Sequence, residues 1–78
     1  MLIGQVSRNV VAPSKHPALQ GAKLLLVEFD DGRPPLLATD TVGAGVGSSV
    51  IVAVGSHAAS IAAPHLPTDA VIVGLLQG

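Results

Sequence analysis

The residues that could do chemistry are few and scattered along this chain of 78 residues. Three histidines, His16, His57 and His65, lie in separate segments, and no helical or strand spacing pairs the last two. A metal site needs several ligands brought together, so we expect surface or interface histidines rather than metal ligands. The chain has no cysteine, which excludes thiolate ligands, disulfides and cysteine nucleophiles. The sequence therefore predicts no metal site.

Ser56, His57 and Asp69 supply the three residue types of a hydrolytic triad. Ser56 lacks the sequence of a nucleophile elbow, and adjacent residues at the start of a helix point apart. The pair Asp30-Asp31 indicates a turn before it indicates an acid pair. We therefore expect no catalytic residue, no cofactor and no enzyme activity.

A glycine-rich segment, Gly43 to Gly47, invites comparison with phosphate-binding loops. It lacks the lysine and threonine of a P-loop, and its glycine spacing differs from the dinucleotide fingerprint. A β-branched strand follows, so no helix N-terminus is available to hold an anion. Two interpretations remain: a turn that needs positive φ, or a loop whose missing side chains let several copies approach a symmetry axis. Asp40, just before the segment, is interpreted as a backbone-capping or interface residue.

The composition excludes two classes of partner. Nearly half of the residues are hydrophobic (49%), yet Phe29 is the only aromatic and only four residues are basic. A nucleic-acid surface needs a basic patch and usually stacking aromatics, so we expect no nucleic-acid partner. Glycine, serine, histidine and proline interrupt every apolar run before the about 20 residues that a spanning helix needs. The first residues, Met1 to Arg8, show no secretory signal, and we expect a cytoplasmic protein with no membrane partner.

Short apolar runs separated by turn signals are typical of a small all-β domain. We expect one domain, residues 1–78, folded as a five-stranded OB-like barrel with one short helix before the last strand. Ser56 is expected to cap that helix and Pro64 to end it. Asp31-Gly32 predicts a two-residue hairpin, and Pro34-Pro35 predicts that the third strand begins at a sheet edge. The expected strands are 2–12, 22–30, 36–39, 49–54 and 70–76.

The strand faces predict self-association. An antiparallel sheet in a small monomer normally has one apolar and one polar face, but three of these strands are apolar on both. In addition, residues 41–68 contain no Asp, Glu, Lys or Arg. A small barrel has only one inside, so we expect neighbouring subunits to cover the outer apolar rows. The residues expected to point outward into such an interface are Leu24, Leu26, Ile51 and Ile72.

Three segments carry a family resemblance. The first includes residues 10–12 and 23–27, the second is Asp40 to Gly47 followed by residues 50–52, and the third combines Gly55-Ser56 with residues 67–74. In this order and spacing they resemble the vertex proteins of bacterial microcompartments, the EutN/CcmL family.

The resemblance implies a structural function. Family members form homopentamers of OB-like barrels at the five-fold corners of a carboxysome or metabolosome shell, which hexameric shell proteins tile elsewhere. The second segment is then expected near the five-fold axis or in the interface; it comprises Asp40, Thr41, Val42, Gly43, Ala44, Gly45, Val46 and Gly47. The alternative is a small OB-like module that binds a ligand or single-stranded nucleic acid, against which the missing aromatics and basic clusters weigh.

Four positions depart from the family pattern. Pro13 stands where threonine is common, Ser48 replaces a usual glutamate, Ala59 a usual arginine and Gln77 a usual terminal aspartate. The last three changes remove charge, so we expect some salt bridges between subunits, or to hexamers, to be absent.

Overall fold

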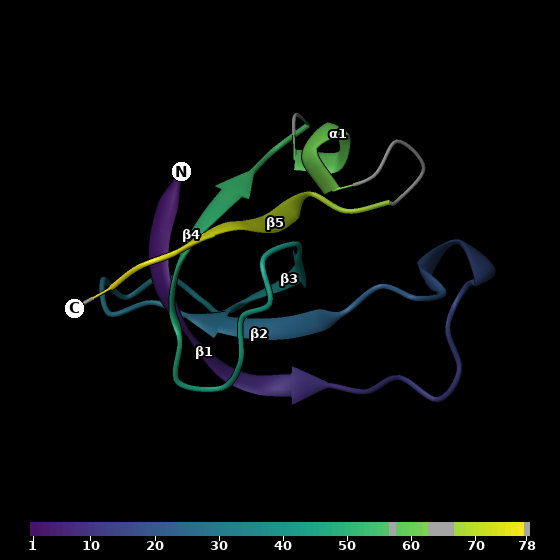
Figure 1. Ribbon diagram of the computed structural model, residues 1–78, viewed down its shortest axis with the longest axis horizontal. Coiled ribbons are helices and arrows are strands. Elements are labelled where there is room, and N and C mark those ends of the chain that lie inside the picture. Colours follow the sequence, from purple (N-terminus) through teal and green to yellow (C-terminus); the bar gives the residue numbers. More distant parts are fainter. Residues whose placement is uncertain (57, 63–66, 78) are drawn as a thin grey trace.

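Five short strands close into a barrel in the computed structural model (Figure 1), which describes residues 1–56, 58–62 and 67–77. Around the barrel the strand order is β1-β2-β3-β5-β4, and β4 returns to β1. Every neighbouring pair is antiparallel except β3 and β5, which run parallel. The expected all-β barrel is confirmed. The strands are β1 (Leu2–Val10), β2 (Leu24–Glu28), β3 (Leu36–Asp40), β4 (Ser49–Val54) and β5 (Ala70–Leu75).

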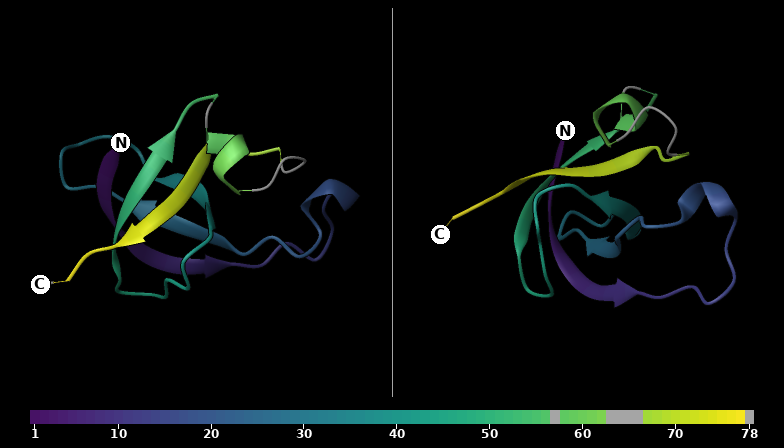
Figure 2. Two further views of the ribbon diagram at one scale, coloured as in Figure 1. Left: turned by 45° about the horizontal axis from the view of Figure 1, so that its top comes forward. Right: turned by 45° about the vertical axis from the view of Figure 1, so that its right-hand side comes forward.

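Two short helices lie in the described connections. The 3-10 helix η1 (Pro17–Leu19) lies between β1 and β2, in a loop that extends away from the barrel in all views (Figures 1 and 2). The one-turn helix α1 (Ala58–Ala62) contacts β5 and is the short helix predicted before the last strand. Pro64, expected to end that helix, lies outside the described residues, and capping by Ser56 stays a prediction. No helix in the described part of the chain is long and apolar enough to cross a lipid bilayer.

Several strands begin or end at residues other than those predicted from the sequence. β4 has the predicted bounds, but β1 ends at Val10 rather than residue 12, because its last paired residue is Val10, opposite Leu24. β2 is shorter than predicted at both ends, β3 extends to Asp40, and β5 ends at Leu75. Hydrophobicity alone does not tell where hydrogen-bond partners stop.

The β2–β3 connection is longer than the predicted two-residue hairpin, since it runs through residues 29–35. Gly32 has the positive φ (88°) expected of it, and the Asp31 carboxylate accepts a hydrogen bond from the Arg33 backbone N–H. The pairing between β3 and β5 begins only at Thr39, opposite Val71. Among the described strands, the first residues of β3 therefore pair with β2 alone. This agrees with the edge predicted from the two prolines, because proline has no N–H to donate.

The barrel interior is filled by aliphatic side chains from all five strands. On β2 the alternation is regular: Leu25 and Val27 are buried, whereas Leu24 and Leu26 are partly exposed on the outside. The interior is so tight that a Cβ on Gly4 would lie 2.6 Å from Val27 Cγ1. The buried aliphatic core comprises Val6, Leu25, Val27, Ala38, Ala44, Val50, Val52, Ala70 and Ile72.

The prediction that Ile72 points outward is wrong. Ile51 pairs with Gly74 and Val52 pairs with Ile72, so Val73 is an extra residue in β5 that forms a bulge. A bulge shifts the alternation of side chains along a strand. Ile72 itself lies before the bulge, opposite the buried Val52 and two residues after the buried Ala70, so regular alternation places it in the core (0% exposed). The bulge after it gives Gly74 the outward position beside Ile51.

Candidate assembly interface

Asp40 organises the loop between β3 and β4, residues 41–48, which we call the glycine loop. Its side chain is only 2% exposed and accepts hydrogen bonds from three successive backbone amides. The distances to the nitrogens of Val42, Gly43 and Ala44 are 3.1, 3.0 and 3.0 Å. Asp40 is thus a backbone-capping residue, one of the two interpretations drawn from the sequence. Because Asp40 already occupies these amides, they are not available to an anion.

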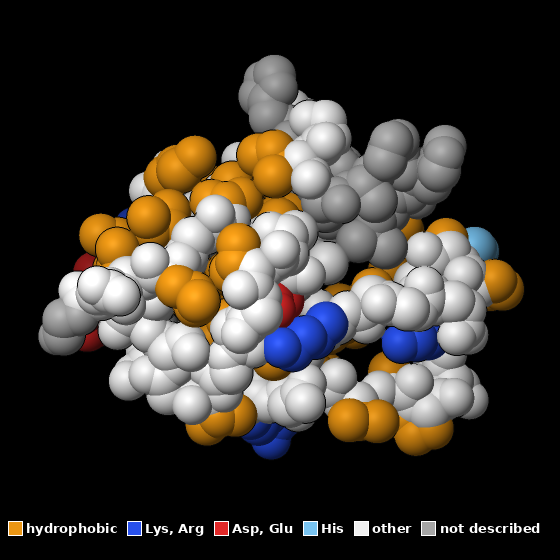
Figure 3. Space-filling view, in the orientation of Figure 1, with side chains coloured by type: hydrophobic (Ala, Val, Ile, Leu, Met, Phe, Trp, Pro, Cys, Tyr) orange, Lys and Arg blue, Asp and Glu red, His pale blue; other side chains and the backbone are white. Residues whose placement is uncertain are grey.

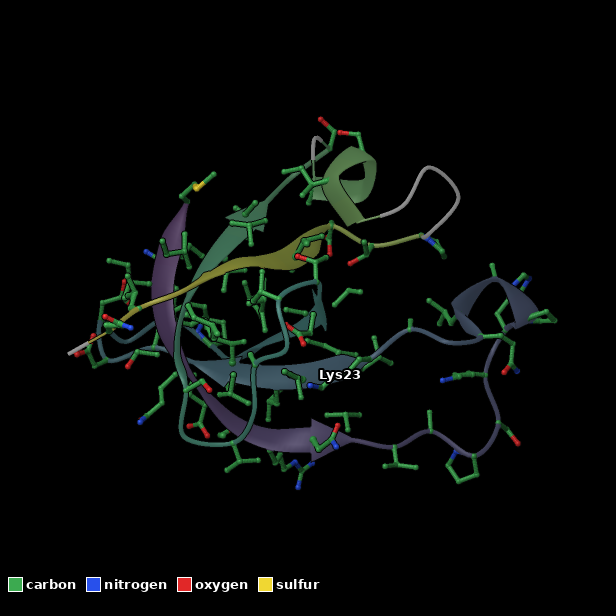
Figure 4. All side chains as sticks on the ribbon, viewed as in Figure 1. Lys23 is labelled. Carbon is green, nitrogen blue, oxygen red and sulfur yellow. The ribbon has the colours of Figure 1, made fainter. Side chains whose placement is uncertain are left out.

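Lys23, directly before β2, lies beside the same loop (Figure 4). Its Nζ is 3.2 Å from Asp40 Oδ2 and donates a hydrogen bond of 2.6 Å to the Ala44 carbonyl. The backbone N–H of Asp40 also donates to the Lys23 carbonyl, at 2.9 Å. Sequence reasoning missed this residue. The available signal was its position directly before β2, opposite the end of β3 in an antiparallel pair.

The charge of Asp40 is held by its partners. Burial by itself would raise the pKa of this carboxyl group, because a low-dielectric site disfavours the charged form. Hydrogen bonds from the Val42 and Ala44 amides and the Lys23 ammonium outweigh that effect, and the pKa of Asp40 lies below its ordinary value. The carboxylate is therefore ionised at neutral pH.

Different glycines of the loop have different reasons to be glycine. Gly43 (φ 80°) and Gly47 (φ 92°) adopt the left-handed backbone region, which confirms the turn interpretation at these two positions. Gly45 has no positive φ, and no described atom lies within 4 Å of the Cβ it would carry. The protomer gives no reason for glycine at Gly45, so close approach of another copy stays a prediction there.

The glycine loop closes one end of the barrel. Ala44 is 1% exposed and belongs to the core cluster, and Val42 packs against that cluster. Further along, the Gly47 N–H donates to the Val6 carbonyl and the Val6 N–H donates to Ser48, both at 2.9 Å. We call this the closed end; it comprises the glycine loop, Asp40 and Lys23. The exposed side chain of Val46 (67%) is the largest apolar group on its outer surface.

Two outward apolar faces lie on different seams of the barrel among the described residues. The β1–β4 face consists of Ile3, Ile51 and Gly74, which are neighbours in register. Ile3 is 68% exposed, and hydrophobic side chains gather on the surface over the N-terminal end of β1 and β4 (Figure 3). Ile51 was predicted to lie outside, whereas Ile3 was missed.

The β2–β3 face consists of Leu24, Leu26 and Leu37, with Leu26 paired to Leu37 in register. Leu37 is 48% exposed, and the two β2 residues are partly exposed. A groove of about 230 Å³ runs beside this face. Its lining includes Leu19, Leu24, Leu37, Thr39, Pro67 and Thr68.

The remaining candidates for chemistry do not converge. His16 Nδ1 accepts a hydrogen bond of 3.0 Å from the Ala18 N–H and so caps η1. Ser56 and Asp69 are both exposed, and His57 and His65 lie outside the described residues. In residues 1–56, 58–62 and 67–77, no three histidine or acidic side chains are grouped as metal ligands.

Comparison with known proteins identifies the family. The model of the family described as "Ethanolamine utilisation protein EutN/carboxysome" matches residues 1–76. This chain belongs to the EutN/CcmL family. The carboxysome shell vertex protein CcmL of Synechocystis sp. is 43% identical to it over 83 residues, covering 99% of this chain and 83% of the relative. The bacterial microcompartment shell vertex protein GrpN of Rhodospirillum rubrum is 41% identical over 84 residues, covering 99% and 93%.

A solved structure agrees with the fold of this EutN/CcmL chain. The GrpN pentameric microcompartment shell protein from Rhodospirillum rubrum superposes with a TM-score of 0.85 at 39% sequence identity. The match covers 100% of this chain and 95% of GrpN. The similarity therefore extends over the whole barrel rather than over one motif.

Ser48, which the family resemblance predicts to stand in place of a glutamate, has a local function in the structure. Its hydroxyl accepts a hydrogen bond from the Gly45 N–H at 3.1 Å, and its own N–H donates to the Gly45 carbonyl at 3.0 Å. The Ser48 side chain therefore closes the turn within the glycine loop. Gln77 is exposed beyond the end of β5. Nothing in the described structure explains the departure that the resemblance predicts at this position.

Proposed function

We propose that this chain is a non-catalytic shell protein whose homopentamers cap the five-fold vertices of a bacterial microcompartment and close its polyhedral shell. Relatives along the full length are named as shell vertex proteins, and the GrpN structure is described as pentameric. The observation that carries the proposal is the pair of outward apolar faces, which leaves Ile3 68% and Leu37 48% exposed in the isolated protomer. A shell provides the neighbours that such a surface needs.

A closed ring requires two different surfaces on each protomer, because head-to-tail contacts are heterologous. The β1–β4 face and the β2–β3 face meet this requirement, since they lie on separate seams of the barrel. We assign the contact between neighbours to these two faces, with Ile3 and Ile51 of one protomer against Leu24 and Leu26 of the next. Each Å² of apolar surface covered in this way contributes about 25 cal/mol.

The glycine loop is assigned to the neighbourhood of the five-fold axis. Gly45 has open space around it and no positive φ, so its missing side chain leaves room for an equivalent loop. The outer perimeter of the ring then meets hexameric shell proteins. A flat hexagonal layer does not close by itself, and five-fold units supply the curvature that closes it.

An outward substitution tests the ring contact. Leu26→Glu places a charge on the β2–β3 face without entering the core, because Leu26 alternates with buried Leu25 and Val27. We expect a folded protomer by circular dichroism that no longer forms rings in size exclusion with light scattering. Glu28→Lys is the matched control on the same strand, at a position that is already polar and exposed. Rings that survive Leu26→Glu would remove this face from the interface.

Deleting the gene from its host tests the function itself. Electron microscopy is expected to show elongated or unclosed shells, because the hexameric layer then lacks its five-fold corners. Complementation with the unaltered gene restores closed polyhedra, whereas the Leu26→Glu gene does not. Normal polyhedra in the deletion strain would refute the vertex function.

A further inference from the structure

The closed end contains an ion pair in which one partner is buried, whereas both partners of a typical surface salt bridge are exposed. Among the described residues, two ion pairs form: Lys23–Asp40 and Arg33–Asp31. Both side chains of the second pair are exposed, at 43% and 50%. In the first pair the Lys23 side chain is 45% exposed, but the Asp40 side chain is only 2% exposed. The Asp40 carboxylate also accepts hydrogen bonds from three loop amides.

Lys23 and Asp40 together hold both polar atoms of one loop residue. The Ala44 N–H donates to Asp40 Oδ2 at 3.0 Å, and the Ala44 carbonyl accepts from Lys23 Nζ at 2.6 Å. The Ala44 side chain is buried in the core at 1% exposure. The ammonium group thus fixes the loop at the point where its backbone enters the barrel, on the side that Asp40 does not reach.

We propose that Lys23 is a positioning residue, which sets the glycine loop in the conformation needed for ring closure before protomers meet. This inference rests on the proposed homopentamer and on the placement of the loop near its axis. Asp40 alone holds the amides of residues 42–44, but only Lys23 holds a carbonyl of the same turn by a side chain among the described residues. Without the ammonium, the Ala44 carbonyl loses that partner and the loop gains alternative conformations.

The effect on assembly is amplified by the number of protomers. Only protomers with a competent loop enter the ring, and apparent affinity falls with the competent fraction. If the loop of a variant is competent about a third of the time, the ring equilibrium scales with the fifth power of that fraction. The protomer concentration at half-assembly then rises about four-fold.

Three variants of the full chain test the proposal. Lys23→Met keeps an apolar stem and removes the ammonium, Lys23→Arg keeps the charge, and Arg33→Met removes an equal charge from the exposed ion pair. Sedimentation over a concentration series gives the half-assembly point, and amide hydrogen exchange reports residues 42–44 directly. Thermal unfolding monitors the fold, which Lys23→Met preserves because the side chain is 45% exposed.

We expect Lys23→Met to raise the half-assembly concentration about four-fold and to speed exchange of the loop amides at least as much. With Lys23→Arg, the half-assembly concentration and the exchange rate of the loop amides lie close to those of the unaltered protein. Arg33→Met matches the unaltered protein in both measurements. Unchanged assembly with Lys23→Met overturns the positioning function, with or without faster exchange, and so does an equal effect of Arg33→Met. An unaltered protein that stays monomeric at every concentration instead refutes the homopentamer, and the Lys23 proposal with it.

Discussion

The two ends of the barrel are covered in different ways. At the closed end a loop crosses the opening, and its amides are paired with Asp40 while Ala44 fills the core. At the open end a cavity of about 340 Å³ remains, where β3 has not yet begun to pair with β5. Its lining includes Leu2, Leu36, Val54, Gly55 and Ala70.

The difference teaches what it takes to cover a barrel with backbone. A loop that enters the core brings amides and carbonyls that need partners, because an unpaired buried polar group costs as much as a lost hydrogen bond. Asp40 and Lys23 provide these partners at the closed end. No buried side-chain nitrogen or oxygen in the described residues lacks a hydrogen bond. At the open end the cavity is instead lined by apolar side chains together with the exposed Arg33 and Asp69.

The largest effect on the closed end is expected when the charge of Asp40 is removed. Asp40→Asn keeps the shape, but the amide offers one acceptor oxygen where the carboxylate offered two, and it repels one of its donors. We expect a loss of about 2 kcal/mol in the free energy of unfolding, measured in urea at fixed protomer concentration. Asp31→Asn, in the exposed ion pair, is the control and leaves the unfolding midpoint unchanged. Equal midpoints for the two variants would contradict the organising function of Asp40.

Acid provides the same test without mutation. The pKa of Asp40 is lower in the folded chain than its ordinary value, so the folded state favours the ionised form. This contribution to stability is fully present above the unfolded-state pKa of about 3.9 and is lost as pH falls through the lower folded-state pKa. The stability gap between the unaltered protein and Asp40→Asn is therefore expected to narrow below about pH 4. A gap that stays constant from pH 7 to pH 3 would show that the charge of Asp40 is not its source.

Glycine substitutions compare a tightly packed position with the free surface of the closed end. In Gly4→Ala the new Cβ lies 2.6 Å from Val27 Cγ1 and 2.8 Å from the Glu28 carbonyl oxygen. We expect a loss of about 2 kcal/mol from overpacking. Gly45→Ala meets open space and is expected to change stability by less than about 0.5 kcal/mol, by the same urea measurement. If Gly45→Ala were the more damaging to the isolated protomer, the description of the closed end would be wrong.

A small effect is also expected at the turn of the glycine loop. Ser48→Ala removes the hydroxyl that accepts the Gly45 N–H, which is exposed to water. We expect a loss of about 0.5 kcal/mol, since water replaces the lost partner. Ser49→Ala is the neighbouring control at an exposed strand position. The two thermal midpoints would coincide if the Ser48 hydroxyl had no effect on the turn.

The parts of the fold that the sequence predicted are those that depend on pattern alone. The alternation in β2 put Leu24 and Leu26 outside, and the bounds of β4 came directly from its β-branched run. The bulge at Val73 was not predictable, because an extra residue in an apolar strand leaves the composition unchanged. Ile72 was placed on the wrong side of the barrel because its neighbours Val71 and Val73 are equally apolar, so the sequence does not tell which row points inward.

The candidate site was predicted in its segment but not in its mechanism. Asp40 was interpreted as a backbone-capping or interface residue, and the structure shows that it caps the loop amides. Lys23 was missed because its contact depends on strand pairing between β2 and β3, which brings together residues distant in sequence. Ile3 was missed because the outward face that it completes is shared by β1 and β4.

The mass of the assembled protein in solution tests the central claim most directly. Native mass spectrometry of the unaltered chain is predicted to give five times the 7.7 kDa of one protomer. A stable, well-folded monomer, with Ile3 and Leu37 in contact with water at micromolar concentration, would contradict the account.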